Sequence, residues 1–295
     1  MKKIIYKIQY YFLMLACKIL CLFPEEKRFK FGDFLGTFTY KFIKKRRLVA
    51  LTNLKMAFPG KDVKELEKIA LTSFQVMMKA FLCTLWLPAY LKNEKNVKIK
   101  NEDIFLEAYK QKKGVMVALL HMGNMEASLK IAEKYPVVTV AKKQRNPYIN
   151  KFIDDSRKND LHLTVFTKSK STSKDLIKRI HNGEIFALFS DHRDKGAEVD
   201  FFGTTAKAPT GSISLALKYD LPVLIAYNYF NPNNTCTAVI EKFDLIKTGN
   251  FKSDVLNNTQ LLINRMEKII TKHPEQWMWF HDRWNLYRKL YRHKK

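Results

Sequence analysis

The sequence predicts an α/β fold with a central mixed, largely parallel sheet flanked by helices. From about residue 101 onward, strand-like apolar runs alternate with helical segments, which is the order that strand–helix–strand units produce. Several of these runs are apolar along their whole length, as strands covered on both faces are. A chain of 295 residues is long enough to bury a large core.

Residues 1–24 predict a membrane-anchoring helix ahead of a single domain over residues 25–295. The apolar body of this segment is interrupted by Lys7 and Lys18, and ten residues separate the two lysines. A spanning helix needs about 20 apolar residues, so the pattern favours a helix in the membrane plane with snorkelling lysines. A tilted spanning anchor and a cleaved signal peptide are the alternatives.

The elements of the main domain are expected in a regular order. After the break at Pro59-Gly60, apolar residues at intervals of three and four predict a helix over residues 62–87. Strands are then expected at 115–120, 136–141, 163–167, 184–191, 221–230 and 235–243. Helices are expected at 101–113, from 124, and at 146–160, 171–183, 210–220 and 254–272. Residues 199–212 are expected to form a long loop whose two phenylalanines contact lipid or an acyl chain.

Three polar residues lie where predicted strands end, which is where open α/β sheets place their functional groups. His121 follows the first strand of the alternating region, Glu126 comes five residues later, and Asp191 closes another strand. A histidine there can take a proton from a hydroxyl while an acid one helical turn further on holds its other ring nitrogen. The alternative is a partly buried histidine, with Glu126 favoured at a helix start by the helix dipole. Asp191 with His192 and Asp194 allows two further interpretations, a metal site or solvated loop charges.

The net charge of +25 requires a polyanionic partner. Nucleic acid and an anionic membrane both qualify, but the chain has no zinc-finger spacing, basic zipper or aromatic RNA-binding pattern. Its four cysteines include no CxxC pair, which favours free thiols in a reducing compartment over disulfides.

Six segments in order along the chain resemble one enzyme family, the late acyltransferases of lipid A biosynthesis. These lauroyl and myristoyl transferases belong to the lysophospholipid-acyltransferase-like superfamily, and the resemblance implies a glycerolipid acyltransferase-like fold. The segments are RRLVALTNLKMAFPGK, GVMVALLHMGNME, NPYINKFIDDSR, GEIFALFSDHR, DFFGTTAKAPTGSISLALKYDLPVL and HPEQWMWFHDRWN.

The resemblance implies the roles of particular residues. The catalytic H-x4-[DE] motif of the family corresponds to His121 and Glu126. Supporting or substrate-binding residues are Lys142, Arg145, Arg157, Asp191 and Arg193. Many members have an arginine where this chain has Lys142, and a lysine cannot form the bidentate contact with an anion that an arginine forms.

The implied reaction moves an acyl chain from acyl carrier protein to a hydroxyl of a lipid A precursor of the Kdo-lipid IVA type. It is a late step of lipopolysaccharide biosynthesis at the cytoplasmic face of the inner membrane, and it uses no cofactor and no metal. The implied partners are the carrier protein, the membrane glycolipid and an anionic membrane surface, without nucleic acid. Two alternatives remain. One is a same-fold acyltransferase acting on a mannosylated phosphoinositide or a lysolipid, and the other is a non-enzymatic protein that binds membranes or nucleic acid.

Overall fold

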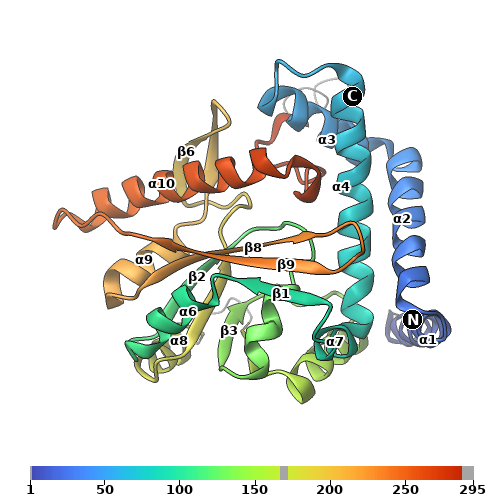
Figure 1. The fold of residues 1–295 in the computed structure, drawn as a ribbon, viewed down its shortest axis with the longest axis horizontal. Helices are drawn as coiled ribbons and strands as arrows, with labels where there is room; N and C mark the ends of the chain where they lie inside the picture. Colours follow the sequence, from blue (N-terminus) through green and yellow to red (C-terminus); the bar gives the residue numbers. More distant parts are fainter. Residues whose placement is uncertain (1, 167–171, 288–295) are drawn as a thin grey trace.

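A computed structural model describes residues 2–166 and 172–287, apart from the side chains of residues 156–160 and 172–174. In this part of the chain, seven strands form one sheet in the order β1-β9-β8-β2-β5-β3-β4, with helices on both faces (Figure 1). Every pairing in that sheet is parallel except β8 with β9. The predicted α/β class is therefore confirmed. The strands are β1 (Val97–Lys100), β2 (Val115–Leu119), β3 (Val137–Val140), β4 (Leu163–Phe166), β5 (Ile185–Phe189), β6 (Ala197–Phe201), β7 (Thr204–Ala208), β8 (Val223–Phe230) and β9 (Cys236–Phe243).

The helices begin and end largely where local sequence signals predict. Asp62 caps α4 by accepting a hydrogen bond from the Glu65 amide, and Asn250 caps α10 in the same way. The α-helices are α1 (Lys2–Cys21), α2 (Glu25–Phe42), α3 (Lys44–Ala57), α4 (Val63–Cys83), α5 (Leu87–Lys92), α6 (Glu102–Lys110), α7 (Pro147–Asp160), α8 (Thr172–His181), α9 (Gly211–Tyr219) and α10 (Phe251–Lys272). Three 3₁₀ turns complete the described elements: η1 (Thr84–Trp86), η2 (Ala127–Glu133) and η3 (Pro274–Gln276).

The two faces of the sheet have different partners. On one face, Ala118, Ile225 and Val239 belong to the core cluster that includes residues of α9 and α10. On the other face, Val117 and Ala226 belong to a core cluster that includes residues of α4, α5 and α6. The central strand β2 is buried at all five positions, which explains why its sequence is apolar throughout rather than alternating.

The structure differs from the sequence-based expectation at residues 199–212. These residues were expected to form a loop, but most of them belong to a hairpin in which β6 and β7 pair antiparallel. Phe201 is fully buried, and Phe202 lies against Phe58 and Trp279 with ring centroids 5.5 and 6.0 Å away. The protein's own aromatic residues therefore shield Phe201 from water and cover part of Phe202, so the expected lipid contact is not needed to explain them.

A second difference concerns the segment after His121. Residues 124–126 form a turn and the 3₁₀ turn η2 follows from Ala127, where the sequence predicted a helix from Asn124. Gly123 explains part of this path, because its φ is +57° and an added Cβ would lie 2.4 Å from the carbonyl oxygen of Asn228 on β8. The chain must therefore turn closely against β8 before a helical turn can begin.

Among the described residues, two helical segments are long and apolar enough to cross a membrane, namely α1 and Val63–Lys92, which contains α4. Half of the apolar window of Val63–Lys92 is buried inside the protein, whereas no residue of α1 is buried. The predicted N-terminal apolar helix is therefore present. Figure 1 shows α4 upright beside the sheet, α2 along its outer side and α1 at the lower end of α2.

Candidate active site

His121 and Asp191 meet because their strands are neighbours. His121 follows β2, Asp191 follows β5, and β2 and β5 pair in parallel with Leu119 opposite Phe189. The carboxyl ends of the two strands therefore lie side by side, two residues before each polar side chain. The His121 ring also stacks on Phe189, with centroids 4.0 Å apart.

Two hydrogen bonds join His121 and Asp191. The His121 ring nitrogen Nδ1 lies 2.7 Å from Asp191 Oδ1, and the His121 amide donates to Asp191 Oδ2 at 2.7 Å. Because an ionised carboxylate only accepts, Nδ1 carries the proton of the first bond, and Nε2 is left as the basic ring nitrogen. The Asp191 side chain is 1% exposed and that of His121 is 21% exposed, so the acid is enclosed while the base is accessible.

The environment keeps Asp191 ionised. Burial alone would raise its pKa, but the charge of His121 and the hydrogen bonds from the His121 ring, the Trp277 indole and the His121 amide together hold the pKa below its usual range. Trp277 Nε1 donates to Asp191 Oδ2 at 2.8 Å. Asp191 is thus ready to stabilise an imidazolium on His121.

The C-terminal segment Pro274–Trp284 supports this pair from behind. Met122 and Trp277 form an isolated antiparallel bridge, and the Met278 amide donates to the His121 carbonyl at 3.2 Å. The fully buried Arg283 donates from Nε to the Asp191 carbonyl at 2.6 Å. Burial lowers the pKa of Arg283 to about 10, so the guanidinium stays charged at neutral pH.

Helices α3 and α4 hold the same segment from its other side. Asn53 Nδ2 donates to the carbonyls of Trp279 and His281 at 2.9 and 2.8 Å, and the Ser73 hydroxyl donates to the Trp277 carbonyl. The sequence did not assign roles to Trp277 or Arg283. The dense aromatic motif WMWFHDRW was the available signal, but its contacts with Asp191 span 86 and 92 residues.

Glu126 lies in the turn before η2 and lines the same cavity as His121. Its Oε1 accepts a hydrogen bond from the Thr84 hydroxyl at 3.3 Å. The sequence suggested that Glu126 holds the second ring nitrogen of His121, whereas in the structure Asp191 holds Nδ1. The catalytic role of Glu126 stays a prediction.

The predicted basic residues lie in different places. Lys142 is exposed and lines the cavity, whereas Arg145 is exposed and is not among the lining residues. Arg193 is partly buried and also lies outside the cavity lining. Arg157 belongs to α7, but its side chain is outside the described residues.

A cavity of about 960 Å³ opens beside His121 and extends under the sheet. Val117 of β2 lines it and pairs with Ala187 of β5, which pairs with Thr139 of β3. Residues in register on neighbouring strands point to the same face, so one face of the sheet forms the cavity wall. The strand residues that line it are Ile99, Val117, Leu119, Val137, Thr139, Val140, Leu163, Val165, Ile185, Ala187, Phe189, Leu224, Ala226, Ala238 and Ile240.

Two further histidines, His192 and His281, also line the cavity. The His192 ring lies nearly perpendicular to that of His121, with centroids 6.0 Å apart. Burial is the largest cause that lowers the pKa of each of these two histidines, and the pKa of His281 falls to about 4. Both are therefore neutral at pH 7, so neither adds a positive charge next to His121. Among the described residues, no group of three or more His, Cys, Asp and Glu could hold a metal ion.

Comparisons with known proteins agree with this geometry. Residues 1–286 match the family model described as bacterial lipid A biosynthesis acyltransferase. The chain is 25% identical over 274 residues to the lipid A biosynthesis acyltransferase of Haemophilus influenzae, covering 88% of this chain and 82% of that protein. It is 26% identical over 180 residues to a phosphatidylinositol mannoside acyltransferase of Mycobacterium tuberculosis strain CDC 1551, covering 58% of this chain and 54% of that protein. The chain thus spans about half the length of this mycobacterial relative.

Proposed function

This chain belongs to the bacterial lipid A biosynthesis acyltransferase family, and on that premise we propose that it transfers a fatty acyl chain from acyl carrier protein to a hydroxyl of a lipid A precursor. The observation that carries the proposal is the hydrogen-bonded pair of His121 and Asp191 beside a large apolar cavity. A general base next to an apolar cavity suits a reaction between an acyl thioester and an alcohol.

The proposed chemistry is a single acyl transfer with His121 as general base. Nε2 of His121 takes the proton of the acceptor hydroxyl, and the oxygen attacks the thioester carbonyl. The new C–O bond forms, the C–S bond breaks, and the departing thiolate takes the proton back from the imidazolium. Asp191 holds the ring in the required tautomer and stabilises its charged form. The reaction needs no cofactor, because both substrates already carry the groups that react.

The other residues of the site take supporting roles in this proposal. Glu126 on the cavity wall contacts the acceptor or the base during proton transfer, and Lys142 at the exposed rim contacts a phosphate of the substrate. The apolar wall formed by one face of the sheet holds the acyl chain. At about 960 Å³ the cavity is at the upper end of the roughly 300–1,000 Å³ typical of ligand sites.

Charge supports the proposed partners and location. An acidic carrier protein, a phosphorylated glycolipid and the anionic cytoplasmic leaflet of the inner membrane would each be attracted by a net charge of +25. The exposed apolar helix α1 supports attachment to that membrane.

The first test measures acyl transfer by the His121→Ala and Glu126→Gln variants. Acyl carrier protein thioester and a tetra-acylated lipid A precursor serve as substrates, and the product is quantified by mass spectrometry. His121→Ala should lose about 10²- to 10⁴-fold in kcat, because a general base contributes about that much. Glu126→Gln should also lower kcat, because a neutral amide cannot replace the carboxylate beside the reacting groups. The His162→Ala variant at an exposed position is the control. Turnover near that of the wild type in His121→Ala would refute the assignment of the base, and in Glu126→Gln it would remove Glu126 from the catalytic residues.

A second candidate acceptor follows from the mycobacterial relatives, which are named phosphatidylinositol mannoside acyltransferases. The same assay with phosphatidylinositol mannoside in place of the lipid A precursor separates the two. Transfer to the mannoside alone, abolished by His121→Ala, would keep the mechanism and replace the acceptor.

A further inference from the structure

The outer face of helix α2 carries four exposed phenylalanines. Phe31, Phe34, Phe38 and Phe42 are between 43% and 67% exposed. Their rings contact one another in sequence, with centroids 6.3, 6.5 and 4.5 Å apart. At 100° per residue the four side chains fall within an arc of about 80°. We refer to these four residues as the phenylalanine row.

The opposite face of α2 is locked onto α4. An added Cβ at Gly32 would lie 2.8 Å from Lys79 Cγ, and one at Gly36 would lie 2.4 Å from Gln75 Cα. The two helices therefore approach as closely as backbones can, along a small-residue spacing that is known from membrane helix pairs.

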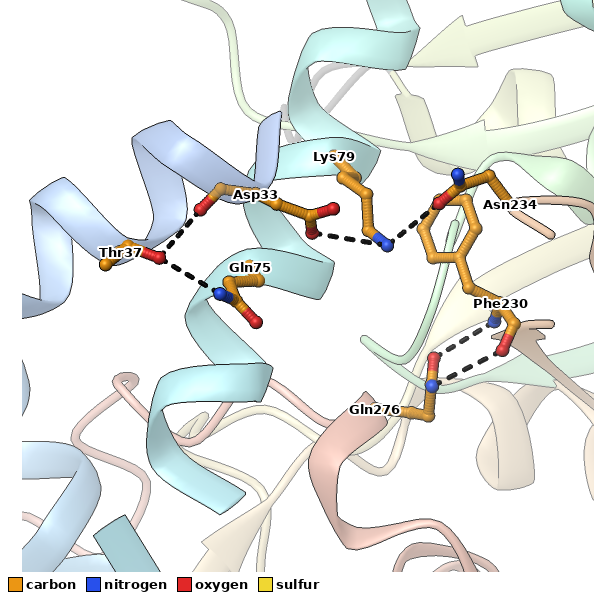
Figure 2. A network of polar contacts seen from close by, with 7 residues as sticks. All are labelled: Asp33, Thr37, Gln75, Lys79, Phe230, Asn234 and Gln276. Atoms are coloured by element: carbon orange, nitrogen blue, oxygen red, sulfur yellow. Dashed lines mark hydrogen bonds and ion pairs between the residues drawn. The ribbon is translucent and has the colours of Figure 1, made fainter. Parts of the chain in front are cut away.

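Polar contacts reinforce this packing, as Figure 2 shows. Gln75 Nε2 donates to the Thr37 hydroxyl at 3.0 Å, and Lys79 Nζ lies 3.3 Å from Asp33 Oδ1. Lys79 also donates to Asn234, in the turn between β8 and β9, at 3.0 Å. Helix α2 is thus held to the core at several points, so it cannot rotate to bury the phenylalanine row.

Cations border the phenylalanine row. By helical spacing, Lys30 and Lys41 fall along one edge of it, and Lys27 continues the row one turn before Phe31. The exposed Lys44 and Lys45 follow its last member, Phe42, after a single intervening residue. Lysine is depleted in the cores of protein–protein interfaces, whereas basic residues beside an aromatic face are typical of helices that lie on anionic membranes.

The position of α1 points to the same partner. Helix α1 touches α2, has no buried residue and is apolar enough to enter a bilayer. Both helices lie on the right side of the molecule in Figure 1, with α4 between α2 and the sheet. One bilayer can therefore contact α1 and the phenylalanine row together.

We propose that the phenylalanine row is a second membrane-docking surface, which inserts into the interface of an anionic bilayer in addition to α1. Ala80 and Phe81 near the end of α4 and Thr84 at the start of η1 line the cavity, and α4 is the helix against which α2 packs. Docking through α2 thus holds the cavity at the membrane surface, where a lipid acceptor enters. The inference stands apart from the acyl-transfer reaction, since it is tested without any measurement of activity.

The test uses tryptophan as a depth reporter in the full chain. All four native tryptophans are at most 4% exposed, so an added surface tryptophan is distinguishable from them. The reporters are Phe34→Trp and Phe38→Trp in the phenylalanine row, with Phe12→Trp as the reporter of α1. Phe251→Trp is the matched control, because Phe251 is 51% exposed and begins α10 at the far side of the molecule from α2.

Each variant is mixed with vesicles of phosphatidylglycerol and phosphatidylethanolamine that carry brominated acyl chains. We expect a blue shift and at least about twofold quenching of the added emission for both row reporters, and neither for Phe251→Trp, because bromine quenches only tryptophans at acyl-chain depth. Quenching of Phe12→Trp with both row reporters unchanged would overturn the proposal, because α1 would then dock alone. A further outcome is that the row reporters show a blue shift without vesicles that grows with protein concentration, and no quenching when vesicles are added. That result would also overturn the proposal, because it would mean that a second copy of the protein covers the phenylalanine row.

A charge variant tests the nature of the lipid. Lys44→Gln combined with Lys45→Gln should weaken binding to phosphatidylglycerol vesicles by about tenfold or more, since each basic residue near an anionic surface adds to the attraction. Binding to neutral phosphatidylcholine vesicles should not change. Unchanged binding to both kinds of vesicle would overturn the choice of an anionic bilayer.

Discussion

His121, His192 and His281 line one cavity in different surroundings. His121 has Asp191 as an enclosed carboxylate partner, and this carboxylate is ionised because three N–H groups donate to it. His192 and His281 have no such partner within hydrogen-bonding distance among the described residues, and burial keeps them neutral. In the proposed reaction the same residue type is therefore the base in one position and part of the cavity wall in the others, and the difference comes from one buried acid.

Stability in acid should depend on His281. Its folded-state pKa is about 4, chiefly because of burial, while the ordinary value is 6.5. Asp191 raises this pKa, whereas His121, Arg283 and His192 lower it further. Between pH 6.5 and 4 the unfolded chain binds a proton that the folded chain does not, so stability is fully present above pH 6.5 and decreases as the pH falls through this window.

Between pH 7 and pH 5, we expect the Tm of His281→Gln to decrease less than the Tm of the wild type. The measurement is a series of thermal melts across this range, with the exposed His162→Gln as control. Part of the decrease should persist in His281→Gln, because burial also lowers the pKa of His192. Equal decreases in His281→Gln and the wild type would contradict the expectation.

At the scale of elements, the packing of α2 on α4 depends on glycine. The nearest atoms to an added Cβ at Gly36 are backbone atoms of Gln75, at 2.4 and 2.6 Å. Backbone atoms cannot swing aside as a side chain does, so an alanine there must push the two helices apart. The greater helix propensity of alanine, about 1 kcal/mol, offsets only part of that cost.

Gly36→Ala should lower the free energy of unfolding by about 1–3 kcal/mol. Gly60→Ala is the matched control, because nothing lies within 4 Å of its added Cβ, and it should change stability by less than about 0.5 kcal/mol. Urea unfolding of both variants measures the difference. A Gly36→Ala protein as stable as Gly60→Ala would show that the helices are not in such close contact.

At the scale of the whole molecule, the sheet serves two purposes. One face packs against α9 and α10 to form a solid core, and the other forms the wall of the cavity. Alanines on that wall leave room where the other strand residues are larger. Ala187 lies opposite Val117 on the neighbouring strand. Val117 comes four residues before His121, so Ala187 lines the wall about 13 Å from His121 along the strand direction.

Ala187→Phe should therefore shorten the acyl chain that the enzyme accepts. We expect transfer of 12- and 14-carbon chains to decrease by about tenfold or more, because overfilling the apolar wall removes space that a long chain needs. Transfer of an 8-carbon chain should change little, and this short donor also reports that the variant is folded. A uniform loss for all chain lengths, measured with a series of acyl carrier protein thioesters, would contradict this use of the cavity.

The sequence by itself determined the class of fold and much of the element order. The strands β2 to β5, β8 and β9 lie where mainly apolar runs predicted them. The central strand β2 is the clearest case, because a strand covered on both faces is apolar throughout. The positions of His121 and Asp191 at strand ends were also legible, since strand ends are a local property of the chain. The short edge strand β1 and the hairpin of β6 and β7 were not predicted, because each strand is only four or five residues long and contains charged or small polar residues.

Only the tertiary structure decided which strand ends meet. Strand β5 is β2's neighbour although β3 and β4 come between them in the chain, and this order brings Asp191 rather than another acid to Nδ1 of His121. The contacts of Trp277 and Arg283 with Asp191, and of Gly36 with α4, likewise join distant parts of the chain. Local periodicity records which face of an element is buried, but the identity of its partner depends on long-range packing, and that packing is settled only when the whole chain folds.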